Sequence, residues 1–169
     1  MHRFLVSAFA LALFATAAVA QDWRPSSAQE ASAREALVGV ITDMQKAEYL
    51  KLYAKLTPAM QARIPEDRFL RQQESSDGQH GRRAQWRITA VVWYPPSSNP
   101  PAMVAEFSVV TQREAEMCGF IVFAEQADGS FLMNRLESNA IPGGISPEQR
   151  LAMQAALEGF PGCGGSPSG

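Results

Sequence analysis

The sequence contains few of the side chains that bind metals or act as nucleophiles. Its 169 residues include two cysteines and two histidines, which is too few, and at the wrong spacing, for a zinc site. No serine stands in a recognisable nucleophile elbow with a paired histidine, which argues against a hydrolase triad. Gly143-Gly144 lacks the flanking residues of a phosphate-binding loop. The sequence therefore predicts no metal site, no cofactor and no catalytic residue.

A large excess of charge of one sign is also missing. The chain has 15 basic and 17 acidic residues, with a formal net charge of −2, and the signs are mixed along it. The single basic cluster, Arg82, Arg83 and Arg87, is short, whereas nucleic-acid binding usually needs a broad basic face. No Lys/Arg-rich amphipathic segment suggests a membrane-surface helix. We expect neither nucleic acid nor a membrane surface as a partner.

Long apolar runs are absent except at the start of the chain. Arg3 precedes an uncharged run over residues 4–20 that ends in Ala18-Val19-Ala20, the three-part pattern of a secretory signal with cleavage after Ala20. The alternative is a retained membrane anchor, but the run is rich in Ala and barely reaches the ~20 residues that span a bilayer. Gln21 follows the cut, not Cys, so a lipoprotein anchor is not expected. The sequence predicts a periplasmic or secreted protein without a membrane anchor after cleavage.

Both cysteines, Cys118 and Cys163, lie in the predicted exported part. An even number of cysteines in an exported chain favours one disulfide. The alternative is a buried thiol at Cys118 and a loose one at Cys163. A disulfide would tie the Gly-rich segment 161–169, which the composition predicts to be flexible, to a single domain over residues 21–160.

Apolar residues recur with helical period in the first half of the chain. We expect a helix from Ser27 or Ala28 to a break near residues 43–46, a second helix over 47–56, a short helix capped by Thr57-Pro58, and another short one from Pro65 through Leu70. The polar segment 75–81, which holds His80, is expected to be a solvated loop.

The period then changes to that of strands. Four strands are predicted, over residues 84–94, 102–112, 117–126 and 130–138, with a hairpin turn at Asp128-Gly129. In the first strand the alternation puts Trp86, Ile88, Ala90, Val92 and Tyr94 on one face and Trp93 on the other. Ser146-Pro147 starts a last helix that ends near Glu158. The fold class is α+β: N-terminal helices packed on a curved four-stranded antiparallel sheet, with an extra C-terminal helix.

Three stretches carry a resemblance to a known family: the helical pair around 37–57, the strand end Val91–Pro96, and Cys118-Gly119-Phe120 with 128–131 and 135–137. Together they resemble an uncharacterised family of secreted bacterial proteins, a domain of unknown function thought to adopt the nuclear transport factor 2-like (cystatin-like) cone. The similarity spans roughly residues 30–140. It implies a cone fold and, together with the signal, favours a Gram-negative periplasm. Cones of this kind often pair through their sheets, which makes a homodimer one partner to consider. The resemblance transfers no catalytic residue, because the family has no established activity.

Cones of this type often hold an apolar pocket with a few polar groups, so polar and aromatic residues of the strands are the pocket candidates. An inward Glu106 near an arginine would be a polar centre that orients a ligand or serves as a base. The alternative is a solvated sheet face with weak ion pairs, with the aromatic pair serving as packing. The candidates are Arg87, Trp93, Tyr94, Glu106 and Arg135.

Three functions follow from these patterns. The first is a non-catalytic envelope module that binds a small apolar ligand or a protein partner. The second is a cone-pocket lyase or isomerase with Glu106 as its base and Arg135 or Arg87 as support. The third is an interaction or structural subunit of an envelope assembly, which a filled core with an apolar surface patch would favour.

Overall fold

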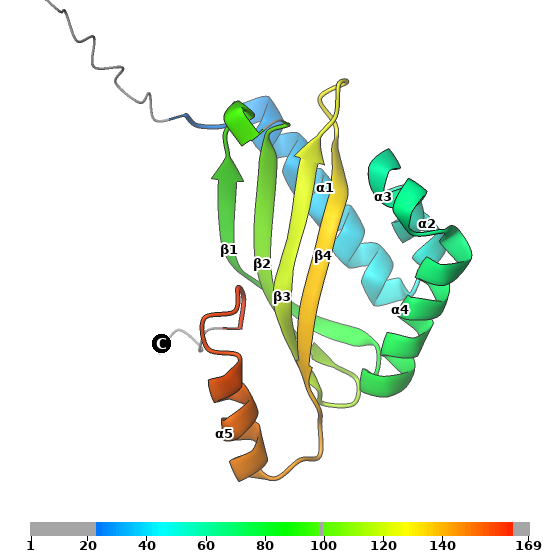
Figure 1. Ribbon diagram of the computed structural model, residues 1–169, viewed down its shortest axis with the longest axis vertical. Coiled ribbons are helices and arrows are strands. Elements are labelled where there is room, and N and C mark those ends of the chain that lie inside the picture. The colour runs from blue at the N-terminus through cyan, green and yellow to red at the C-terminus, as the bar shows by residue number, and fades with distance from the viewer. Residues whose placement is uncertain (1–22, 99, 164–169) are drawn as a thin grey trace, which may run out of the picture.

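The computed structural model describes residues 23–98 and 100–163, so the predicted signal segment lies outside the described residues. In this part of the chain, five α-helices and four strands follow one another in the order helices, sheet, helix, which confirms the predicted α+β class (Figure 1). The elements are α1 (Ser27–Lys46), α2 (Tyr49–Ala54), α3 (Pro58–Arg63), α4 (Glu66–His80), β1 (Arg83–Tyr94), the 3-10 turn η1 (Pro96–Ser98), β2 (Ala102–Thr111), β3 (Glu116–Glu125), β4 (Phe131–Ile141) and α5 (Pro147–Ala156).

Local sequence sets the helix boundaries. The Ser26 hydroxyl accepts a hydrogen bond from the Gln29 N–H, and the Gln29 side-chain oxygen accepts one from the Ser26 backbone N–H, so a capping box starts α1. The helix stops where Ala47 adopts a left-handed conformation. A second capping box, formed by Ser146 and Gln149, starts α5. None of the helices in the described part of the chain is long and apolar enough to cross a membrane.

The helix α4 differs from the prediction, because residues 75–80 are helical and not a loop. Phe69 and Gln73 are buried on the inner side of this helix. Asp77, one turn further on, accepts a hydrogen bond from the Tyr49 hydroxyl. These tertiary contacts outweigh the weak helix propensity of the polar segment. The helix ends at Gly81, whose φ of 83° suits glycine.

The strands form one antiparallel sheet in the order β1-β2-β3-β4. Figure 1 shows α1 running behind the sheet, α2 to α4 beside β4, and α5 at the end of the molecule remote from the β3–β4 hairpin. The face toward α1 is the core face: Phe107, Ile121 and Phe123 from the strands pack there against Met44 and Leu52. We call the opposite face of the sheet the outer face.

A bulge in β1 changes which residues face the core. The register with β2 shifts between Ile88 and Ala90, so the alternation reverses beyond this point. Trp86 and Ile88 pack on the core and so does Trp93, whereas Val92 and Tyr94 are exposed. The prediction that one uninterrupted alternation holds from Trp86 to Tyr94 was wrong for this reason.

Candidate functional site

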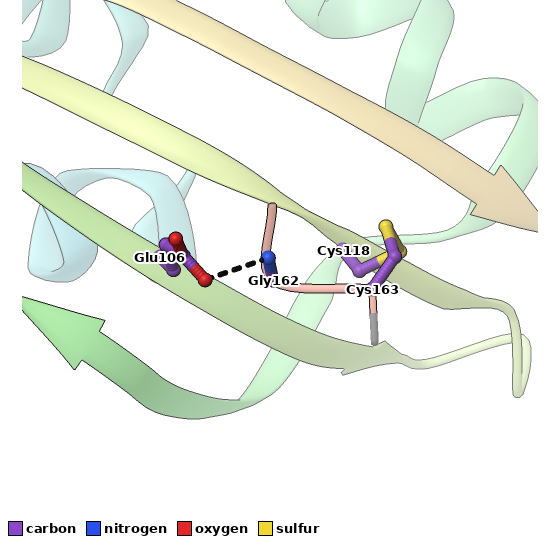
Figure 2. Close-up of a disulfide and its surroundings, with 4 residues drawn as sticks. All are labelled: Glu106, Cys118, Gly162 and Cys163. Carbon is purple, nitrogen blue, oxygen red and sulfur yellow. Dashed lines mark hydrogen bonds between the residues drawn. A yellow bond between two sulfur atoms is a disulfide. The ribbon is translucent and has the colours of Figure 1, made fainter. Parts of the chain in front are cut away.

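The last described residues, 160–163, lie on the outer face of the sheet and are fixed there by a disulfide. Cys118 on β3 and Cys163 are bonded to each other, with Cα atoms 5.0 Å apart, which confirms the predicted pairing. One residue before the disulfide, the Gly162 N–H donates a hydrogen bond to Glu106 Oε2 at 3.0 Å (Figure 2). Further back, the ring of Phe160 lies 6.1 Å from that of Phe120. We call residues 160–163 the tail clasp.

Gly162 brings the backbone of the tail clasp down onto the backbone of the strands. Its φ of 75° is in the left-handed region, and a Cβ at this position would lie 2.3 Å from the carbonyl oxygen of Gly119 and 2.6 Å from that of Phe107. Both the conformation and the space therefore require glycine. The tail clasp covers the outer face around Cys118, and Cys118 is buried.

The predicted pocket residues lie apart from one another. Glu106 alternates with the buried Ala105 and Phe107 and so faces outward, half-buried beneath the tail clasp and away from the helices. Arg135 is exposed on β4, where its Nε donates to Glu137 at 2.7 Å and its guanidinium lies 5.6 Å from the centre of the Phe120 ring.

The remaining candidates are also scattered. Arg87 pairs with Ser108 on the outer face, is exposed, and forms no ion pair within residues 23–98 and 100–163. Trp93 packs edge-on against Phe131, with ring centres 5.8 Å apart, and Tyr94 is exposed. Glu106 therefore forms no polar centre with either arginine, and the geometry of a cone-pocket base with arginine support is not found.

The upper half of the outer face is apolar and carries no described helix. Val92 and Tyr94 are 42% and 47% exposed. The register places them beside half-buried apolar residues of the next three strands on the same face. Figure 1 shows this half of the sheet turned away from α1 and above α5. We call this surface the outer patch, and it consists of Val92, Tyr94, Ala102, Val104, Phe120, Val122 and Leu132.

Sequence reasoning missed a polar cavity along the edge of β4. Its volume is about 470 Å³, within the range of about 300–1,000 Å³ of small-ligand pockets. Arg83 lies in its wall although only 5% of this residue is exposed. The other lining residues come from α4, β4 and the tail clasp, and they are Gln73, Ser76, Leu136, Glu137, Ser138, Asn139 and Phe160.

The buried guanidinium of Arg83 has only loose partners. It donates to Gln73 Oε1 at 3.5 Å and to Ser76 Oγ at 3.3 Å, and it lies 3.7 Å from Asp77 Oδ1. The Asp77 carboxylate is at the same time held by the Tyr49 hydroxyl. Burial, the largest effect, lowers the pKa of Arg83, and the nearby Asp77 only partly offsets it. The Arg83 guanidinium is thus a buried cation beside a cavity, and its own contacts are long and mostly to neutral groups. Such a cation is suited to bind an anionic group.

A second cavity, of about 330 Å³, lies between α1 and the upper part of β4. It is lined mainly by apolar atoms, with Lys55 at its wall. The ammonium group of Lys55 is paired with the buried carboxylate of Asp43, so this charge already has its partner. Within the described residues, no group of three His, Cys, Asp or Glu side chains is placed to hold a metal ion.

Comparison with known proteins gives little to add. No protein-family model and no curated protein matches the chain. A solved structure from Catenulispora acidiphila is similar at 12% identity, with a TM-score of 0.46, over 67% of this chain and 91% of that one. The function must therefore be argued from the site itself.

Proposed function

We propose that this protein is an exported, non-catalytic module that docks a partner protein on its outer patch. The observation that supports this most directly is an apolar half-sheet, with Val92 and Tyr94 well exposed, on the face opposite the hydrophobic core. Exposed apolar surface of this kind marks interaction sites in stable proteins. Neither of the two cavities is lined by a residue of the outer patch, which favours a macromolecular partner over a small apolar ligand on this face.

Export is part of the proposal. A disulfide is consistent with an oxidising compartment, and the sequence of residues 1–20 has the pattern of a signal peptide. We therefore propose a Gram-negative periplasm for the mature protein. We also propose that its fold is a nuclear transport factor 2-like cone, because a long bulged β1 opens a four-stranded meander after the helices. The intact mass of the protein purified without reductant tests export: it should correspond to a chain that begins at Gln21 and contains one disulfide.

Site-specific crosslinking tests the docking. A photo-reactive residue at Tyr94 of the exported chain should give one discrete adduct in its native host. The same residue at Val38, a 58% exposed position on α1, should not. Adding Val104→Lys should abolish the adduct at Tyr94, because a charge in the middle of the patch opposes its desolvation.

The composition of the adduct distinguishes the remaining possibilities. A heterologous protein that is lost with Val104→Lys supports the proposal. An adduct of two copies of this chain would instead identify the outer patch as a homodimer interface. Equal labelling from Tyr94 and Val38, or no adduct at either position, would contradict docking on this face.

A further inference from the structure

The lower part of β4 presents an unpaired strand edge inside the polar cavity. The Glu125 N–H donates to the Pro101 carbonyl, so odd-numbered residues of β3 bond to β2 and even-numbered ones bond to β4, as antiparallel alternation requires. Glu137 and Asn139, opposite Phe120 and Cys118, therefore bond to β3. The backbone groups of Leu136 and Ser138 consequently point away from the sheet.

The upper part of the same edge is already covered. Met133 donates to the Lys55 carbonyl at 2.8 Å and accepts from the Thr57 N–H at 2.9 Å, so residues 55–57 pair with β4 as a single parallel bridge. Below this bridge, no backbone hydrogen bond within the described part of the chain reaches Leu136 or Ser138. An edge strand with free N–H and carbonyl groups is a template on which another strand can pair.

The free edge and the buried arginine occupy one cavity. Leu136 and Ser138 line it together with Arg83, with Gln73 and Ser76 of α4, and with Phe160 of the tail clasp. The cavity thus brings together the backbone hydrogen-bonding groups of a free strand edge, a desolvated cation and an aromatic ring. These three features match the requirements of strand addition with a carboxylate anchor.

The geometry points to this cavity as a docking groove for an extended peptide segment of a partner protein, which adds as a strand to the Leu136–Ser138 edge of β4 and ion-pairs through a carboxylate with Arg83. An extended peptide fits better than a free small acid, because only a peptide satisfies the outward backbone groups of β4 as well as the guanidinium. None of the residues that line the groove belongs to the outer patch, so this inference stands independently of the proposed function.

The test uses the disulfide-bonded mature protein and two libraries of short random peptides. One library contains Asp and Glu and has free carboxyl termini, and the other lacks acidic residues and is C-terminally amidated. We expect binders only from the acidic library, and we expect them to slow hydrogen exchange of the Leu136 and Ser138 amides. Arg83→Gln should weaken them about tenfold or more, the usual effect of losing a charged hydrogen bond.

A second pair of variants keeps the test valid if Arg83→Gln fails to fold. Ser138→Pro removes the outward N–H, and proline is tolerated at such an edge position because no sheet hydrogen bond is lost. Ser138→Ala keeps the N–H and serves as the matched control. Binding should be lost in Ser138→Pro, kept in Ser138→Ala and kept in Val104→Lys, the variant that removes docking on the outer patch.

Three results would overturn the inference. They are the absence of any peptide selected from the acidic library, selected peptides that bind Ser138→Pro as well as the unchanged protein, and binding of free succinate at Arg83 in place of any peptide. The last of these would make the cavity a small-acid site.

Discussion

The Glu106 carboxylate accepts a hydrogen bond from the backbone N–H of Gly162, with 3.0 Å between Oε2 and the nitrogen. This bond joins the middle of β2 to the end of the described chain. This contact gives the one acidic side chain among the pocket candidates a structural partner on the outer face. Next to it, the Cys118–Cys163 disulfide holds the same segment covalently. The tail clasp therefore has a covalent and a polar attachment, whose contributions can be separated by substitution.

Replacing Glu106 should loosen the tail clasp without unfolding the domain. Glu106→Ala removes the acceptor of the Gly162 N–H, and we expect the free energy of unfolding to fall by roughly 1–2 kcal/mol. Glu106→Gln keeps an oxygen at the same place and should lose less. Hydrogen exchange at Gly162 reports the contact directly: faster exchange in Glu106→Ala than in Glu106→Gln is expected, and equal exchange in both would contradict the assigned role.

Breaking the disulfide should have a larger effect. The two cysteines lie 45 positions apart, and closing a loop of this length stabilises a fold by up to about 4 kcal/mol in the chain-entropy model. We expect Cys163→Ser to lower the free energy of unfolding by roughly 2–4 kcal/mol in denaturant titrations. Reductant should destabilise the unchanged protein by a similar amount and leave Cys163→Ser unaffected. A reductant effect on the variant would show that the loss does not come from this bond.

The sequence alone predicts the elements well where a single local signal decides them. The helix start at Ser27 and the caps Thr57 and Ser146 agree with expectation, and the Asp128-Gly129 turn joins β3 to β4 through a Gln126–Ser130 hydrogen bond. The strand ends lie within three residues of their predicted positions. The disulfide followed from compartment and cysteine number.

Features that depend on contacts between distant elements could not be predicted. The extension of α4 to His80 depends on Tyr49 holding Asp77, and the inward turn of Trp93 depends on an extra residue in β1 that alternation does not reveal. Arg83 was visible only as part of a short basic cluster. Its burial arises because α4 folds back over the start of β1, and only the spacing of Gln73, Ser76 and Asp77 on one helix face hints at a common partner.

Two glycines near the end of the chain allow backbone strain to be separated from a steric clash. Gly159 and Gly162 both have positive φ, 83° and 75°, but a Cβ would meet nothing within 4 Å at Gly159 and the strand backbone at Gly162. Gly159→Ala should cost only the conformational penalty, about 1–2 kcal/mol. Gly162→Ala should cost more and raise hydrogen exchange over residues 160–163. Equal losses of unfolding free energy in the two variants would show that the tail clasp does not press on the strands.

The contact between Tyr49 and Asp77 predicts how stability changes in alkaline solution. Burial, together with the hydrogen bond to Asp77, raises the pKa of Tyr49 well above its ordinary value near 10. Because the folded state holds the phenol proton more tightly than the unfolded state, this contribution is complete below pH ~10 and is lost as the pH rises from there toward the folded-state pKa.

Tyr49→Phe should remove this dependence. The variant lacks the hydroxyl that binds Asp77, so at neutral pH its free energy of unfolding should be lower by roughly 1–2 kcal/mol. Above pH ~10 the unchanged protein should lose stability relative to Tyr49→Phe by at most about 1.4 kcal/mol per pH unit. Denaturant titrations across this range measure the difference, and parallel curves for the two proteins would show that Tyr49 titrates with the same pKa in the folded and unfolded states.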